Sequence, residues 1–275
     1  METQIKNPEV KSQAAKTVNT VNTLDISEDF YSIQGEGVTT GVPSYFIRLK
    51  SCNLMCGGPD GSLMKTGKAT WWCDTEYVWR QGIEKEFDYL INKWEDENIL
   101  DWVLDGRVHL IWTGGEPTIP RHQKAIVSFL THLDKLYDRL QDPIHVYNEI
   151  ETNGTIVINN DLFDKLDQIN CSVKLQNSGM PKSRRINPEA LERIIEHKKH
   201  YFKFVISEER DMEEIISDFV IPFDINPKRV LMMPGLDRQE NYHERTKFCM
   251  EMAKSYGFIG LTRLHVSAWD QTTGV

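Results

Sequence analysis

Three cysteines, Cys52, Cys56 and Cys73, fall within one short segment of the chain. The residues between them are rich in glycine and turn formers, which predicts a loop. Thiolates are soft ligands that suit zinc and iron–sulfur clusters. A closed zinc site needs four ligands, and this loop offers no fourth Cys or His. On spacing alone, the alternatives to a cluster with one open iron are three unrelated buried thiols or a zinc site completed by a distant histidine.

The residues around the cysteines favour the cluster. The sequence RLKSCNL occupies 48–54, WCDT occupies 72–75 and TGGEP occupies 113–117. This combination is similar to the cluster loop and the amino-group motif of the radical S-adenosylmethionine (SAM) superfamily, with an insertion at 57–72. Three cysteines then hold three irons of a [4Fe–4S] cluster, and the fourth iron is expected to bind SAM.

Short apolar runs alternate with longer amphipathic stretches from residue 43 onward, which predicts a parallel α/β sheet. Because parallel sheets place their chemistry at the carboxyl ends of strands, the polar motifs that follow these strands are expected to converge on one face. About seven strands are predicted, at 44–49, 108–112, 144–150, 171–175, 201–206, 230–233 and 260–266. Helices are predicted at 81–100, 123–140, 161–168, 188–197, 212–219 and 242–256.

The overall composition is that of an acidic globular protein. The chain has 275 residues and a formal net charge of -9, which disfavours a general nucleic-acid binder and suits a small-molecule substrate. Residues 1–23 are polar and are expected to form a mobile tail, and 24–275 a single domain. No apolar run is long enough to span a membrane or to form a signal-peptide core, so a cytoplasmic protein is expected, in the host cytoplasm if the chain is viral.

A more specific resemblance rests on the order of several motifs. QGEG at 34–37 precedes the cysteine loop, and TGGEP, ETNG at 151–154 and RLH at 263–265 follow it. This order resembles the 7-carboxy-7-deazaguanine synthase family of radical SAM enzymes over roughly residues 24–275. The resemblance implies a partial, modified (β/α) barrel that converts 6-carboxy-5,6,7,8-tetrahydropterin to 7-carboxy-7-deazaguanine with loss of ammonia. It also implies SAM, a [4Fe–4S] cluster, Mg²⁺, a homodimer and an electron donor such as flavodoxin, with no direct nucleic-acid partner.

The resemblance also implies roles for individual residues. Cys52, Cys56 and Cys73 bind the cluster, and Thr75 contacts Mg²⁺; the alternative for Asp74 or Thr75 is a helix N-cap. The expected SAM contacts are Trp72, Cys73, Asp74, Gly115, Glu116, Glu151, Thr152, Ser172, Val173 and Lys174. The expected substrate contacts are Ile33, Gln34, Gly35, Glu36, Arg48, Thr113, His265 and Val275.

Chemistry suggests what some of these side chains do. Glu36 can accept two N–H groups from a guanidine-like edge, and Arg48 offers a bidentate fork to a carboxylate. Glu116 can accept a hydrogen bond from the SAM ammonium group. Gly114 and Gly115 would let the backbone approach SAM closely.

Two departures from the family pattern leave alternatives open. Sixteen residues separate Cys56 from Cys73, which are usually close together in this family, and Val173 replaces the usual proline of a Ser-Pro-Lys motif. The alternatives are another radical SAM activity, such as an activase of glycyl-radical enzymes, or a degenerate member with a regulatory binding role.

Overall fold

The computed structural model describes residues 21–137, 145–235 and 239–270, with Thr272 and Gly274. Its centre is a nine-stranded sheet in the order β3-β1-β2-β4-β5-β6-β7-β8-β9. The strands from β2 to β9 run parallel, whereas β1 pairs antiparallel with both β2 and β3. The strands are β1 Thr23–Ile33, β2 Pro43–Leu49, β3 Ile83–Glu86, β4 His109–Gly114, β5 Asn148–Thr152, β6 Gln168–Cys171, β7 His200–Ile206, β8 Val230–Pro234 and β9 Ile259–Gly260.

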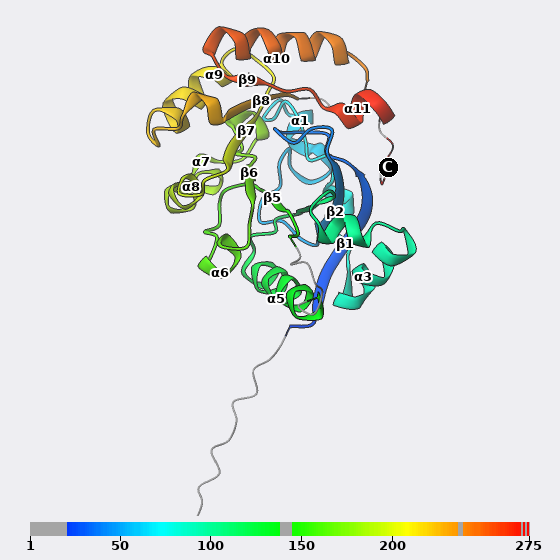
Figure 1. Cartoon of the computed structure of the whole chain (residues 1–275). Helices are drawn as coiled ribbons and strands as arrows, with labels where there is room; N and C mark the ends of the chain where they lie inside the picture. The colour runs from blue at the N-terminus through cyan, green and yellow to red at the C-terminus, as the bar shows by residue number, and fades with distance from the viewer. Residues whose placement is uncertain (1–20, 138–144, 236–238, 271, 273, 275) are drawn as a thin grey trace, which may run out of the picture.

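Helices surround the curved sheet on its outer side (Figure 1). The longer ones are α3 Phe87–Asp96, α5 Pro120–Tyr137, α8 Pro188–Ile195 and α10 Tyr242–Tyr256. The shorter ones are α1 Ser62–Lys65, α2 Glu76–Trp79, α4 Leu100–Leu104, α6 Asn160–Phe163, α7 Lys182–Arg185, α9 Asp211–Glu214 and α11 Leu264–Trp269. A π-helix, Ile215–Val220, continues α9, and 3₁₀ turns cover Pro59–Gly61, Gln176–Ser178 and Pro227–Arg229.

The hydrophobic core lies between the sheet and these helices. Proline at the first position of α5 is compatible with a helix start, and the apolar stripe that follows faces the sheet. Phe129 on this stripe packs edge-on against Trp112 of β4 and Trp94 of α3, with ring centroids 5.8 and 6.0 Å apart. The core therefore ties α3 and α5 to one side of the central strands and leaves the opposite, inner side for other residues.

The alternation of strands and helices was predicted correctly, but several elements differ. The predicted strand at 171–175 is wrong beyond Cys171, because β6 covers Gln168–Cys171 and the chain then leaves the sheet. The predicted helix at 161–168 is shorter in the structure, since α6 ends at Phe163 and β6 begins at Gln168. The strand β1 was not predicted, because its apolar alternation stops after Leu24 and Ile26 and the rest is only half-buried. Residues 83–86 form β3 rather than the start of a helix, because they pair with β1. The predicted strand at 260–266 is wrong beyond Gly260, since α11 begins at Leu264.

Two sequence predictions fall partly or wholly where the structure gives no description. The proposed tail at 1–23 lies mostly outside the described residues, and so does the predicted strand start at 144. Within the described ranges, no helix is both long and apolar enough to cross a bilayer.

Candidate active site

The inner face of the sheet is polar because strand residues alternate between two sides. Trp112, Ile150 and Phe202 lie in the hydrophobic core, so their neighbours on the same strands face inward. Arg48 on β2 pairs in register with Thr113 on β4, and Glu151 on β5 pairs with Asn170 on β6. The inner face therefore carries Arg48, Thr113, Glu149, Glu151, Asn170, Ser172 and Lys203.

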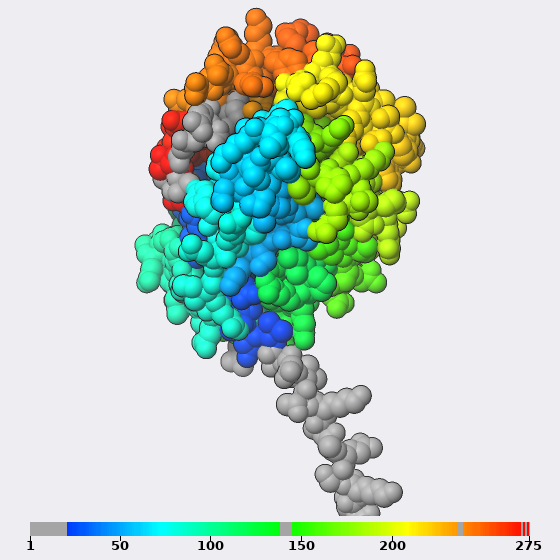
Figure 2. All heavy atoms as spheres, turned by 180° about the vertical axis from the view of Figure 1, so that it is seen from behind, coloured from blue at the N-terminus to red at the C-terminus, as the bar shows by residue number. Residues whose placement is uncertain are grey.

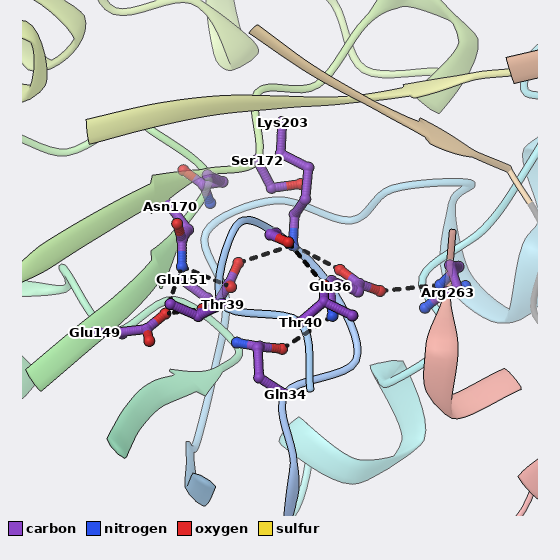
Figure 3. Close-up of polar contacts among 12 residues, drawn as sticks. Gln34, Glu36, Thr39, Thr40, Glu149, Glu151, Asn170, Ser172, Lys203 and Arg263 are labelled. Atoms are coloured by element: carbon purple, nitrogen blue, oxygen red, sulfur yellow. Dashed lines mark hydrogen bonds and ion pairs between the residues drawn. The ribbon is translucent and has the colours of Figure 1, made fainter. Parts of the chain in front are cut away.

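Lys203 stands between two carboxylates on this face. Its side chain is only 4% exposed, and its Nζ lies 2.6 Å from Glu36 Oε2 and 2.9 Å from Glu151 Oε2. Figure 3 shows Lys203 pointing down between these two residues. The two carboxylates raise the pKa of Lys203 above its ordinary value despite burial, so this lysine is a fixed cation.

Glu36 is held from a second side by the C-terminal segment. Arg263 Nε lies 2.9 Å from Glu36 Oε1 (Figure 3). Arg263 Nη2 lies 2.6 Å from Asp74 Oδ2. Burial raises the pKa of Glu36, but Lys203, Arg263 and His265 together hold it well below the ordinary value. A row of alternating charges thus runs from β5 to the cysteine loop: Glu151, Lys203, Glu36, Arg263 and Asp74.

The QGEG segment is a tight loop that places Gln34 and Gly35 beside this row. The Gln34 backbone accepts from Gly41 and donates to Val42, both at 2.8 Å. A Cβ at Gly35 would lie 2.2 Å from Nδ1 of His265, so the histidine ring packs where only glycine fits. Gln34 Oε1 accepts from the backbone N–H of Glu36 at 3.2 Å, whereas its Nε2 has no acceptor among the described residues. A buried amide donor without a protein partner is free to bind a ligand or a water molecule.

Arg48 supplies a cation on the neighbouring strands. Its Nε lies 3.0 Å from Glu28 Oε2, but these two atoms do not have hydrogen-bond geometry. Glu28 is the residue of β1 that pairs with Arg48 in the register of β1 and β2. A Cβ on Gly274 would lie 3.6 Å from Glu28 Oε1, so Gly274 lies close to this pair. Val275 itself lies outside the described residues.

The cysteine loop follows β2. Its second and third cysteines, Cys56 and Cys73, remain close in space despite the long insertion between them. The backbone N–H of Cys73 donates to the carbonyl of Cys56 at 3.1 Å, so the insertion at 57–72 leaves and returns at one place. Such a compact loop with adjoining ends is an Ω-loop. It is fastened to the segment after β6, because Gly57 N–H donates to Ser178 at 2.8 Å and Thr70 N–H donates to Asn177 at 2.9 Å.

The donor set of this loop is three thiols, the soft ligands that iron–sulfur clusters take. Burial, with the nearby Glu116 carboxylate, raises the pKa of Cys52 to about 12. Burial raises the pKa of Cys56 to about 11, although Lys174 opposes the rise. Nevertheless, no three His, Cys, Asp or Glu side chains of the described residues are placed to hold one metal ion. A four-iron cluster binds each thiolate through a different iron and tolerates a wider spacing. N–H groups also point at the sulfurs: Trp79 Nε1 lies 3.4 Å from Cys73 Sγ.

The two glycines of TGGEP are required by a close approach of backbones. A Cβ at Gly114 would lie 2.2 Å from the Leu49 nitrogen, and one at Gly115 would lie 1.8 Å from the Ser51 oxygen. The end of β4 therefore packs directly against the start of the cysteine loop. The sequence interpretation assigned these glycines to a close approach of SAM, and the structure gives them a role between two protein segments.

Glu116 is buried and accepts hydrogen bonds from within the chain. Its carboxylate accepts from Thr118 N–H at 3.0 Å and Oγ1 at 2.6 Å, from Thr152 Oγ1 at 2.7 Å and from Asn153 N–H at 2.7 Å. Burial raises the pKa of Glu116, and these four donors oppose that rise. Glu116 thus joins the end of β4 to the end of β5. The side chain of Thr152 points toward Glu116 and not toward the inner face that carries Glu151.

The segment after β6 carries a lysine near the cysteine loop. Lys174 Nζ donates to Ser172 Oγ at 2.8 Å and lies 5.7 Å from the ring centre of Trp71 in the insertion. Trp71 Nε1 donates to Asn177 Oδ1 at 2.8 Å. Val173 is 1% exposed and lies in the hydrophobic core, so only its backbone could contact a ligand.

Comparison with known proteins gives relatives along most of the chain, although no family model matches it. The 7-carboxy-7-deazaguanine synthase of Thermoplasma acidophilum is 32% identical over 197 residues, which cover 71% of this chain and 75% of that protein. The synthase of Pyrobaculum aerophilum is 29% identical over 251 residues, which cover 90% and 96%. The chain belongs to the 7-carboxy-7-deazaguanine synthase family.

A solved structure agrees with this fold. QueE from Escherichia coli matches with a TM-score of 0.59 at 20% identity, over 88% of this chain and 95% of that one. The predictions of a 7-carboxy-7-deazaguanine synthase and of a modified α/β fold of the radical SAM type are therefore confirmed.

The structure brings most residues expected from the resemblance to this family to one edge of the sheet. Gln34, Gly35, Glu36, Asp74 and His265 lie around the row of charges described above. Thr75 occupies the N-cap position of α2, but its side chain makes no capping hydrogen bond; its hydroxyl lies 3.5 Å from Cys73 Sγ. Ile33 and Trp72 are exposed, and Trp72 packs over the glycines of the insertion.

Sequence reasoning missed Lys203, Arg263 and Asn170 as members of the site. A signal for Lys203 was present, because a lysine between two phenylalanines on an apolar strand must face a side that can hold its charge. Asn170 donates to Glu149 at 3.0 Å and to Glu151 at 3.2 Å (Figure 3). Nothing in the local sequence indicates those two contacts.

Proposed function

We propose that this chain is a radical SAM enzyme that converts 6-carboxy-5,6,7,8-tetrahydropterin to 7-carboxy-7-deazaguanine with loss of ammonia. Its relatives carry the name of that synthase. The observation that carries the proposal is a buried set of charged and polar side chains beside a three-cysteine loop. Gln34 Nε2 has no acceptor there among the described residues, and Glu36 connects through Arg263 to Asp74, the neighbour of Cys73.

Cys52, Cys56 and Cys73 would hold a [4Fe–4S] cluster, and membership of the family implies both this cluster and SAM. When bound, they supply the radical that starts the reaction. Lys174 and Ser172, which are hydrogen-bonded to each other, would meet the polar groups of SAM beside the loop. Thr75 would add an oxygen ligand for Mg²⁺, which keeps several waters and shares substrate oxygens.

The inner face would bind the pterin by its two chemically distinct edges. Glu36 is held ionised, so it can accept from the guanidine-like edge, and the unpaired Nε2 of Gln34 can donate to the adjoining carbonyl. Arg48 would meet the substrate carboxylate by exchanging its contact with Glu28. The insertion and the helix-covered side of the sheet would keep water away from the radical.

Other features follow from this function as part of the proposal. An electron donor such as flavodoxin would reduce the cluster in the cytoplasm, and two copies would form a homodimer. The alternatives of a glycyl-radical activase or a non-catalytic regulator are not favoured, because the relatives are synthases.

The test is anaerobic reconstitution with iron and sulfide, followed by incubation with SAM, reductant and the carboxytetrahydropterin. Mass spectrometry should detect 7-carboxy-7-deazaguanine and 5′-deoxyadenosine in wild type. Cys73→Ala should lose iron and lower product formation at least about a thousandfold, because the cluster would lose one of its three ligands. SAM cleavage without the deazaguanine acid would contradict the proposed substrate, and an iron-free wild type would contradict the enzyme class.

A further inference from the structure

Three consecutive residues at the start of α11 hold the QGEG loop in place. Arg263 pairs with Glu36, a residue 227 positions earlier in the chain. Leu264 N–H donates to the carbonyl oxygen of Gly35 at 2.9 Å, and the ring of His265 fills the space beside that glycine. Figure 2 shows this C-terminal segment in red at the edge of the face that carries the cysteine loop in light blue. The QGEG loop therefore depends on the C-terminal segment for its position.

Arg263 also reaches the cysteine loop, so one side chain joins two loops of the site. Its Nε lies 2.9 Å from Glu36 Oε1, its Nη2 lies 2.6 Å from Asp74 Oδ2, and its side chain is only 12% exposed. The two contacts use different nitrogens of one rigid, planar guanidinium group. The distance between the carboxylates of Glu36 and Asp74 is therefore set by the size of this group.

Arg263 also balances the repulsion between these two carboxylates. Burial and the nearby Glu36 raise the pKa of Asp74, but Arg263 and Arg48 hold it below the ordinary value. Glu36 is held ionised as well, so the two groups are like charges that repel each other. Without the guanidinium between them, they would move apart and carry the QGEG loop away from Cys73, which directly precedes Asp74.

We propose that Arg263 is a positioning residue that fixes where the pterin lies relative to the radical formed beside the cysteine loop. This inference rests on the proposed function, in which Glu36 binds the guanidine-like edge of the substrate and Cys73 binds the cluster. The radical removes a hydrogen atom from the substrate only when the two are close and aligned. A radical that misses a displaced pterin takes its hydrogen atom from a thiol in the buffer, which forms 5′-deoxyadenosine and a thiyl radical without product.

The experiment compares Arg263→Lys and Arg263→Met with Arg245→Met, a matched control at an exposed arginine on α10. Lysine keeps the positive charge, but its single nitrogen holds two carboxylates closer together than two guanidinium nitrogens do. Anaerobic isothermal titration calorimetry measures the Kd of the carboxytetrahydropterin for the cluster-loaded enzyme without SAM. After addition of SAM, dithionite and dithiothreitol, mass spectrometry measures 5′-deoxyadenosine and the deazaguanine acid. Urea unfolding measures stability.

Arg263→Met should raise the Kd of the pterin about tenfold and the ratio of 5′-deoxyadenosine to deazaguanine acid at least about fivefold, because small displacements of reacting groups cost large factors in rate. Arg263→Lys should recover most of the stability but keep a raised ratio, whereas the control should match wild type. If Arg263→Met does not fold, Arg263→Lys alone decides.

A wild-type ratio in Arg263→Lys would overturn the inference, because the charge alone would then be sufficient. A wild-type Kd of the pterin in a folded Arg263→Met variant would overturn it as well. Failure of the proposed function has a different signature: the wild-type enzyme itself would cleave SAM without forming the deazaguanine acid.

Discussion

Lys203 is a buried cation whose two carboxylate partners come from distant parts of the chain, Glu36 before β2 and Glu151 on β5. At the scale of single residues, this arrangement decides which charges the inner face can offer a ligand. Lys203 neutralises part of the repulsion between Glu36 and Glu151, while Arg263 completes the pairing of Glu36. Glu36 is therefore kept charged and fixed in place before any ligand binds.

Replacing Lys203 with methionine should lower the free energy of unfolding by about 3 to 5 kcal/mol, because buried carboxylates would lose their cation. Urea unfolding at neutral pH measures this change. Lys228→Met, at an exposed lysine, is the control and should change stability by less than about 0.5 kcal/mol. Equal stability of the two variants would mean that the buried ion pairs contribute nothing net.

Glu36 should also make stability depend on pH. Its pKa in the folded chain lies well below the ordinary value of 4.5, so its contribution is complete above that pH. The contribution is lost as the pH falls from 4.5 through the lowered folded-state pKa. Urea unfolding from pH 7 down to pH 3 should show a shallower acid loss in Glu36→Gln than in wild type. Parallel curves would contradict the depressed pKa.

The insertion at 57–72 is the clearest case in which an element, rather than a residue, sets the geometry of the site. It begins and ends beside the hydrogen bond from Cys73 to Cys56, and its body is fastened elsewhere. Thr70 Oγ1 donates to Ser207 Oγ at 2.9 Å, and Trp71 bonds to Asn177. The insertion therefore joins the cysteine loop to the segments that follow β6 and β7.

Deleting residues 58–71 should leave iron binding intact but weaken SAM binding several-fold. The deletion joins Gly57 to Trp72, so Cys56 and Cys73 stay close, whereas Lys174 loses Trp71 beside it. Iron and sulfide content and equilibrium dialysis with labelled SAM measure the two effects. A Thr66→Ala variant at the exposed tip of the insertion serves as the control. Loss of iron in the deletion variant would show that the insertion is needed to assemble the loop.

At the scale of the whole molecule, the nine strands of the described residues belong to one sheet, with β3 at one edge and β9 at the other. Hydrogen bonds join each pair of neighbouring strands in this sheet, and the buried apolar residues packed against it form one continuous core. Neither the sheet nor the core therefore separates the chain into two units. We propose on this ground that residues 24–275 form one domain.

A single domain should unfold in one transition. Tryptophan fluorescence and far-ultraviolet circular dichroism should give the same urea midpoint for the metal-free, reduced chain, because Trp94 and Trp112 share one core with the central strands. Calorimetric and van't Hoff enthalpies should also agree. Two separated midpoints would contradict the proposal of one domain.

The sequence by itself was enough to identify the chemistry and the family. Thiols in one loop, the motifs after successive strands and the two-residue alternation of strands are local properties, so they can be recognised without coordinates. The positions of the motifs, each after a predicted strand, predicted the edge of the sheet at which they lie. The bounds of the central strands and helices were predicted approximately.

The tertiary structure decided which of these groups meet. Cys56 and Cys73 are separated by sixteen residues but are adjacent in space, because the insertion closes on itself. Lys203 and Arg263 meet Glu36 because β7 and the start of α11 pack beside the QGEG loop, and Glu116 turns toward internal donors. Contacts between distant segments depend on how strands and loops pack, and no local pattern of residue types specifies that packing.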